Sequence, residues 1–136
     1  MEFVFEGRRT PGGRTPGGTS PDYPAVRITR HKEGAKDNRY RLYFAFNPEA
    51  VELARWIDGD MITPGADRQN RMIGFKRDPL TGFRLSTLKK GQRRHNANFQ
   101  ASYETASAIR AVIENSLGKW IRLHQAGILL VTETIE

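Results

Sequence analysis

The chain contains no cysteine, which excludes disulfide bonds, a thiolate nucleophile and cysteine-ligated metal sites. It also contains no run of about 18 apolar residues, the length that a membrane-spanning helix needs. Residues 1–20 lack the apolar centre of a secretory signal. We therefore expect no membrane segment and a cytoplasmic location. The 136 residues leave room for one ordinary domain, which spans 1–136.

Acidic residues are outnumbered, and they are almost missing from one segment. The chain has 22 lysine and arginine residues against 15 aspartate and glutamate residues, a formal net charge of +7. Asp78 is the one acidic residue in 71–95, where the basic residues are Arg71, Lys76, Arg77, Arg84, Lys89, Lys90, Arg93 and Arg94. Such a charge run either only solvates a surface or binds phosphates, and the aromatic residues within it favour phosphate binding. The excess of positive charge predicts a polyanionic partner.

Catalytic and metal-binding patterns are missing as well. The three histidines are far apart in the sequence and share no metal-ligand spacing. Asp58, Asp60 and Asp67 are explained more simply as turn residues than as ligands of a magnesium ion. The sequence has no glycine-rich phosphate loop and no serine-centred elbow. We therefore expect no enzyme activity, no metal and no cofactor.

Strand patterns dominate what is present. Apolar alternation predicts strands at residues 1–7, 25–30, 39–46, 61–63, 71–77, 82–88, 95–102, 120–124 and 128–135. One short helix is predicted to begin at the Asn47-Pro48 cap, and a second at Ser102 or Thr105, ending near Leu117. The sequence thus predicts an α+β fold, a β-rich single domain with two short helices.

Proline and glycine mark the expected loops. Residues 8–20 contain the pentapeptide Arg-Thr-Pro-Gly-Gly twice in tandem, which cannot hold a helix or a central strand. We expect a flexible basic loop there, serving either as a linker or as an arm along a phosphate backbone. Further loops are predicted at 64–70 and at 89–95, and the basic loop 89–95 is expected to contact a nucleic-acid backbone.

The segment 39–46 alternates most clearly. One face is predicted to be core and carries Tyr40, Leu42, Phe44 and Phe46. The opposite face carries Arg39, Arg41 and Tyr43, the combination of cations and a flat ring that contacts phosphates and stacks on bases. We expect Lys76 and Arg84 to lie on the same exposed sheet face.

The other aromatic residues leave alternatives open. Phe75, Phe83 and Phe99 are either core residues or stacking platforms, with the core favoured. Trp120 alternates with apolar neighbours and is either an exposed platform or part of the packing of a hairpin. The predicted nucleic-acid-binding residues are Arg39, Arg41, Tyr43, Arg71, Lys76, Arg77, Arg84, Lys89, Lys90, Arg93, Arg94 and Trp120.

Two segments repeat the order strand, cap, helix, glycine turn, strand. At a constant offset of 55 residues, matches are found between Phe44 and Phe99, Asn47 and Ser102, Glu49 and Glu104, and Arg55 and Arg110. Either an internal duplication or shared capping chemistry explains this agreement, and a duplicated strand–helix–strand unit is one of the fold predictions.

The first of these segments resembles the swapped-hairpin units of AbrB-type DNA-binding proteins, through its Asn47-Pro48-Glu49 helix entry and its Gly59-Asp60 turn. The resemblance covers about residues 39–63, extends to 96–131 in the second segment, and implies duplex DNA binding. The loop at 63–70 departs from that pattern. The small size, basic charge, pentapeptide arm and aromatic-rich strands are also similar to phage-encoded single-stranded DNA-binding proteins of N4-like phages. That similarity implies a cofactor of transcription or replication in the host cell cytoplasm.

We therefore expect a non-enzymatic protein that binds single-stranded DNA with little sequence specificity. Duplex DNA, RNA and RNA polymerase are the further candidate partners. A homo-oligomer is expected, because a β-rich domain has strand edges to protect. Two alternatives stay open, an AbrB-like regulator of duplex DNA and a host-takeover protein that docks on an acidic protein surface.

Overall fold

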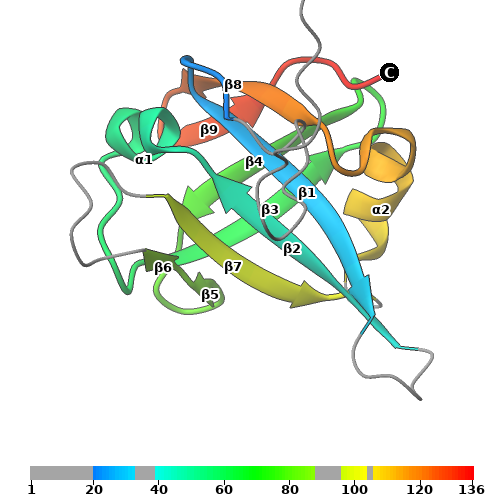
Figure 1. The fold of residues 1–136 in the computed structure, drawn as a ribbon, viewed down its shortest axis with the longest axis horizontal. Coiled ribbons are helices and arrows are strands. Elements are labelled where there is room, and N and C mark those ends of the chain that lie inside the picture. The colour runs from blue at the N-terminus through cyan, green and yellow to red at the C-terminus, as the bar shows by residue number, and fades with distance from the viewer. Residues whose placement is uncertain (1–19, 33–38, 88–95, 104–105) are drawn as a thin grey trace, which may run out of the picture.

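A computed structural model describes residues 20–32, 39–87, 96–103 and 106–136 (Figure 1). The expected strand at 1–7, most of the pentapeptide segment 8–20 and the loop 89–95 lie outside the described residues. The strands are β1 (Ala25–Lys32), β2 (Tyr40–Phe46), β3 (Met61–Asp67), β4 (Met72–Arg77), β5 (Phe83–Arg84), β6 (Ser86–Thr87), β7 (Ala97–Ser102), β8 (Trp120–Ala126) and β9 (Leu129–Thr132). The helices are α1 (Pro48–Ala54), α2 (Ser107–Ile113) and the short 3-10 helix η2 (Glu114–Ser116). The predicted β-rich α+β fold with two short helices is confirmed.

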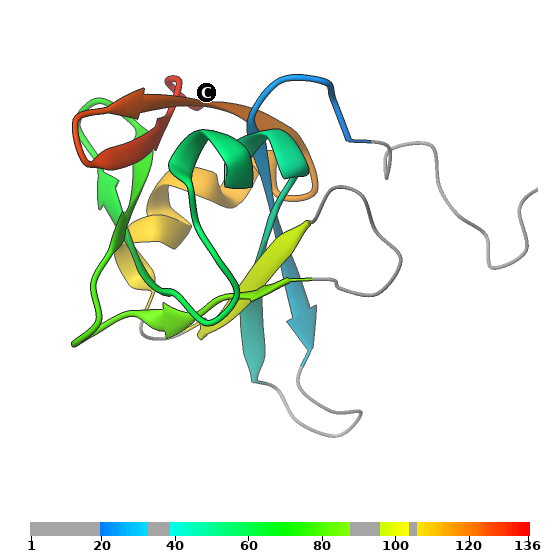
Figure 2. The same cartoon turned by 90° about the vertical axis from the view of Figure 1, so that its left-hand side faces the viewer.

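The strands form one antiparallel sheet that closes on itself. Its order is β5-β3-β4-β9-β8-β1-β2-β7-β6, and only Leu85 separates β5 from β6 in the chain. One extended segment therefore pairs with β3 on one side and with β7 on the other. This pairing closes the sheet into a barrel (Figures 1 and 2). The second half of β3 pairs with β4 on one side, has no strand on its other side, and contacts α2. Edge protection, the reason for expecting an oligomer, thus does not apply to most of the described strands.

The barrel has the topology of two equivalent halves. Exchanging β1 with the β5–β6 segment, β2 with β7, β3 with β8 and β4 with β9 leaves every strand neighbour unchanged. Phe44 and Phe99, the pair at offset 55, are direct partners between β2 and β7. From the helices onward the offset is 59, which separates α1 from α2 and β3 from β8. Gly59 and Gly118 occupy equivalent turns with φ of 92° and 84°, so the structure supports an internal duplication.

Aromatic rings fill the barrel between opposite strands. Phe44 and Phe46 of β2 lie against Phe75 of β4, with ring centroids 5.9 and 4.9 Å apart. Phe99 of β7 stacks on Phe44 at 4.6 Å and on Phe83 at 5.7 Å. Phe75 and Phe99 are buried and Phe83 is partly buried. All three rings therefore belong to the core, which was the favoured alternative.

The chain enters α1 through the predicted Asn47 cap. Asn47 is fully buried, and its Oδ1 accepts hydrogen bonds from the amides of Ala50 and Ala25 at 3.0 and 2.9 Å. Its Nδ2 donates to the carbonyls of Pro21 and Tyr23. One side chain therefore caps the helix and joins it to the segment that leads into β1.

Two predicted boundaries are wrong. The loop expected at 64–70 is strand as far as Asp67, because Pro64 lies where β3 has no second neighbour and its missing N–H costs no ladder bond. The cap expected for the second helix is not Ser102, which belongs to β7. Ala106 stands at the N-cap of α2 without a side-chain hydrogen bond, and Thr105 lies outside the described residues.

Candidate nucleic-acid interface

The outer surface of β1, β2, β7 and β8 forms one continuous face. Residues directly opposite each other on antiparallel strands point to the same side of a sheet, and Arg27 is opposite both Ala45 and Trp120. Tyr43 is opposite both Thr29 and Gln100. We call the outward residues of these four strands the basic face; they are Arg27, Thr29, His31, Arg41, Tyr43, Ala45, Asn98, Gln100, Ser102, Trp120, Arg122 and His124.

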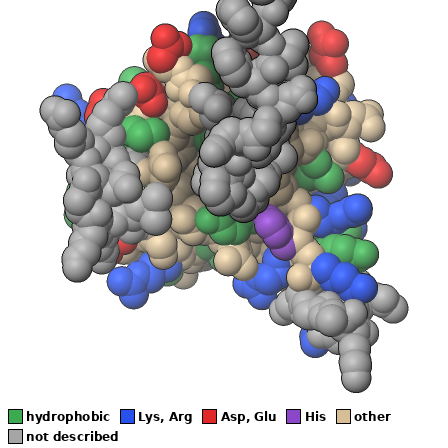
Figure 3. Space-filling view, viewed as in Figure 1, with side chains coloured by type: hydrophobic (Ala, Val, Ile, Leu, Met, Phe, Trp, Pro, Cys, Tyr) green, Lys and Arg blue, Asp and Glu red, His purple; other side chains and the backbone are tan. Residues whose placement is uncertain are grey.

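No aspartate or glutamate occurs in these four strands. Their lysine and arginine residues are Arg27, Arg30, Lys32, Arg41 and Arg122. In Figure 3, which has the view of Figure 1 with β1, β2 and β7 toward the reader, blue side chains gather at the lower right, where β1 ends. Arg27, Arg41 and Arg122 point outward, and the carboxylate of Glu133 lies 3.9 Å from Nε2 of His124 at one end of the face. The excess of cations in these strands attracts polyanions.

Two guanidinium groups of the basic face lie over aromatic rings. The Cζ atom of Arg27 is 5.1 Å from the ring centroid of Trp120, and that of Arg122 is 3.9 Å from the ring centroid of Tyr23. Cation–π contact of this kind holds the charge in place at the surface. Trp120 thus lies on the basic face, where Arg27 covers one side of its partly exposed ring and its Nε1 atom is buried.

Tyr43 stands in the middle of the basic face. Its ring is partly exposed and meets the ring of His31 edge-on, with centroids 5.5 Å apart. The Nε2 atom of His31 is 3.0 Å from the hydroxyl of Thr29. These neighbours fix the tyrosine ring beside Arg41, as the alternation of β2 predicted.

A second group of cations and rings lies at the end of the barrel near the β1–β2 connection, and the sequence reading missed it. The guanidinium of Arg30 lies over the ring of Tyr40 at 4.9 Å, and that of Arg110 over the ring of Tyr103 at 4.3 Å. Hydrogen bonds from Arg30 and then Arg110 to the hydroxyl lower the pKa of Tyr103 below its usual value. No local pattern joins residues 30, 40, 103 and 110; only the register between strands brings them together.

Four predicted residues lie away from the basic face. Lys76 on β4 is exposed across the barrel from β2, so the expectation that it shares the face of Tyr43 is wrong. Arg84 is exposed on β5, and this segment continues as β6 beside β7, so Arg84 lies one strand beyond the basic face. Arg77 pairs with Asp60 at 3.1 Å. Arg71 donates to the carbonyls of Val112 and Ile135, which ties β4 to α2 and the C-terminal segment.

The remaining predicted residues divide into two groups. Arg39 is exposed immediately before β2, at the end of the basic face that also carries Arg41. Lys89, Lys90, Arg93 and Arg94 lie outside the described residues.

Three findings bear on other functions. Among residues 20–32, 39–87, 96–103 and 106–136, no group of three histidine, aspartate or glutamate side chains is placed to hold a metal ion. No helix in the described part of the chain is long and apolar enough to cross a membrane. Comparison with protein-family models, with curated proteins and with solved structures finds no match to this chain.

Proposed function

We propose that the protein is a non-enzymatic nucleic-acid-binding protein that prefers single-stranded DNA and reads little of its sequence. The observation that supports this most directly is the basic face, whose four adjacent strands carry no carboxylate and turn Arg27, Arg41 and Arg122 outward. Among these cations lie the partly exposed rings of Tyr43 and Trp120. Cations along a groove and rings that stack on bases are the two parts of a single-strand binding surface.

The chemistry of the basic face suits an unpaired strand better than a duplex. Rings that lie on a sheet need bases that are free to leave their own stack, and each base stacked on an aromatic side chain contributes about 1–3 kcal/mol. Reading a duplex groove needs an element that projects into it. Of the two α-helices, α1 carries no basic residue and α2 only Arg110, whose guanidinium lies over Tyr103.

The cellular role that fits this binding is assistance to transcription or replication of a phage genome in the host cytoplasm. The small size and the excess of basic residues support this role, through the similarity to single-stranded DNA-binding proteins of N4-like phages. RNA polymerase is the protein partner that such a role implies, and self-association would place several basic faces along one strand.

Regulation of duplex DNA by an AbrB-like protein is the second candidate. The equivalence of the two halves of the barrel favours it, because each half has the order hairpin, helix, hairpin with a glycine turn after the helix. Two such units within one chain fit the resemblance of residues 39–63 and 96–131 to swapped-hairpin units.

Fluorescence anisotropy with labelled oligonucleotides of equal length tests these proposals. Single-stranded DNA, duplex DNA and single-stranded RNA are titrated at two salt concentrations. We expect single-stranded DNA to bind most tightly and the affinity to fall steeply with salt, because bound phosphates release counterions. Tighter binding of the duplex would support the AbrB-like alternative. Binding to none of the three would overturn both proposals and favour docking on an acidic protein surface.

A further inference from the structure

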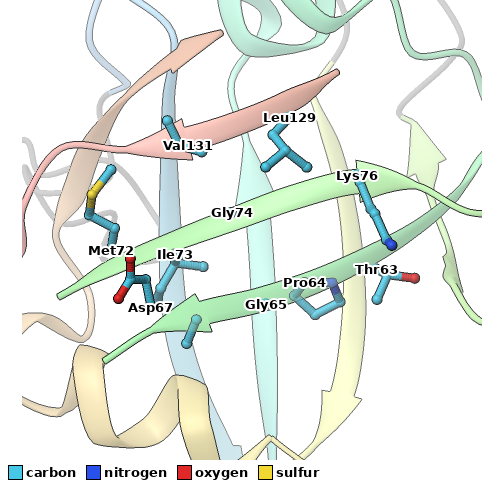
Figure 4. Close-up of a pocket in the computed structure, with 11 residues that line it drawn as sticks. Thr63, Pro64, Gly65, Asp67, Met72, Ile73, Gly74, Lys76, Leu129 and Val131 are labelled. Atoms are coloured by element: carbon cyan, nitrogen blue, oxygen red, sulfur yellow. The ribbon is translucent and has the colours of Figure 1, made fainter. Parts of the chain in front are cut away.

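An apolar groove of about 370 Å³ crosses the outer surface of β3, β4 and β9, across the barrel from β1 and β2 (Figure 4). All of its lining residues belong to these three strands, and none to a helix. Gly65 of β3 and Gly74 of β4 are direct partners at its centre, so the floor of the groove is backbone without side chains. Leu129 and Val131 of β9 form its apolar wall.

Opposite charges stand at the two ends of this groove, at equal distances from the glycine pair. Lys76 is opposite Thr63, two positions to one side, and Asp67 is opposite Met72, two positions to the other side. Each end is therefore about 7 Å from the glycine pair along the strands. Figure 4 shows Lys76 at one end and Asp67 with Met72 at the other. Hydrogen bonds from the side chain and the amide of Asn70 lower the pKa of Asp67, so its carboxylate is charged at neutral pH.

We propose that the groove is a self-association surface, which binds a second copy of the chain through a two-fold contact centred on Gly65 and Gly74. The proposed two-fold axis lies between the facing sheets of the two copies and is perpendicular to their strands. The strands of one copy therefore run opposite to those of the other. The Lys76 end of one copy then meets the Asp67 end of the other, and this happens twice in the dimer. The paired glycines let the two sheets approach closely, and the apolar side chains around them are then buried away from water.

The charge pattern is what points to a second copy of this chain as the occupant. One cation and one anion placed symmetrically about a centre are complementary to themselves after a two-fold rotation. Ile128, which is 86% exposed, and Leu129, which is 36% exposed, extend the apolar surface at the β8–β9 turn. The dimer leaves the basic face of each copy open, because that face lies on the opposite side of the barrel. The inference goes beyond the proposed function and is tested without nucleic acid.

Sedimentation velocity of the full chain and of two charge-reversal variants tests the pairing. We expect the parent protein to form a dimer. Lys76→Asp and Asp67→Lys should each weaken it by about tenfold or more, because like charges then meet at both ends of the contact. An equimolar mixture of the two variants should form a dimer again, since each end now joins a lysine to an aspartate. A parent protein that stays monomeric, or a mixture that does not recover, would overturn the proposal.

A third variant keeps the test independent of the turn that Asp67 forms with Asn70. Gly65 does not have a positive φ, and an added Cβ meets no atom of its own chain within 4 Å. Gly65→Leu should therefore fold and still block the close approach of a second copy. Gln100→Leu adds the same side chain to an exposed position of β7 on the other side of the barrel and serves as the control. With circular dichroism and thermal unfolding showing that both fold, we expect a monomer for Gly65→Leu and a dimer for Gln100→Leu. A Gly65→Leu variant that dimerises as the parent does would contradict the proposal.

Discussion

At the scale of single residues, the structure repeatedly places a guanidinium over an aromatic ring. Arg27 lies over Trp120, Arg122 over Tyr23, and Arg110 over Tyr103. A guanidinium held in this way loses less side-chain freedom when it binds a phosphate. Affinity for an anionic chain then comes from cations that are already in position.

The ring of Tyr43 gives the sharpest residue-level prediction for binding. Tyr43→Ala should weaken binding to single-stranded DNA by about 1–3 kcal/mol, the contribution of one stacked base. Tyr43→Phe keeps the ring and should bind nearly as the parent does. Anisotropy titrations of the two variants measure the difference. If the alanine variant bound as tightly as the phenylalanine variant, Tyr43 would not be a stacking platform.

The hydroxyl of Tyr103 should ionise before those of the other tyrosines. Hydrogen bonds from Arg30 and Arg110 favour its ionised form, so its pKa in the folded protein lies below the unfolded value of about 10. The folded state therefore gains stability from this group as the pH rises through the folded pKa, and loses it as the pH falls back. A titration followed by tyrosinate absorbance should show an early step that Tyr103→Phe removes and Arg110→Gln moves to higher pH. An early step that survives Tyr103→Phe would assign it to another tyrosine.

At the scale of elements, Asn47 joins three segments that would otherwise be held by packing alone. It caps α1, bonds the amide at the start of β1 and holds the two carbonyls before that strand. Asn47→Ala should lower the free energy of unfolding by about 3 kcal/mol, because a helix cap is lost and buried polar groups are left without partners. Urea unfolding measures this loss. Asn115→Ala, at an exposed position, should change stability by less than about 0.5 kcal/mol.

Local rules predicted where helices and strands lie better than they predicted which strands pair with each other. Alternation identified β2 and its two faces, and Asn47-Pro48 fixed the start of α1. Pro64-Gly65 was interpreted as a loop because both residues usually end strands. The structure accepts them where β3 has no second neighbour. Whether a strand lies at a free edge depends on pairing, which the sequence of that strand alone does not contain.

The same limit applies to the candidate site. Arg41, Tyr43 and Trp120 were predicted and are found on one face. Lys76 and Arg84 were expected there as well. Alternation tells which side of a strand a residue occupies, but not which strand lies beside it. The closure of the sheet places Lys76 across the barrel and Arg84 one strand beyond β7. Arg27 and Arg122 were missed for the same reason, because they lie on different strands and only the register brings them together.

At the scale of the whole molecule, closure of the barrel separates two surfaces of different chemistry. The basic face occupies β1, β2, β7 and β8, and the apolar groove occupies β3, β4 and β9. Because the two surfaces are on opposite sides, a partner on one does not obstruct the other. The two surfaces differ although the two halves of the barrel are equivalent in topology. Equivalent strands such as β3 and β8 carry different outward residues, so one belongs to the groove and the other to the basic face.

The most direct test of the account is the salt dependence of single-strand binding in two variants that remove equal charge. One replaces Arg27, Arg41 and Arg122 of the basic face by glutamine, and the other replaces the exposed Arg55, Arg68 and Arg77 elsewhere on the barrel. Each lost phosphate contact reduces the slope of log affinity against log salt by about 0.7 for a single strand. We therefore expect a slope reduced by about 2 in the first variant and nearly the parent slope in the second. Equal slopes in the two variants would show that net charge, and not the basic face, governs binding.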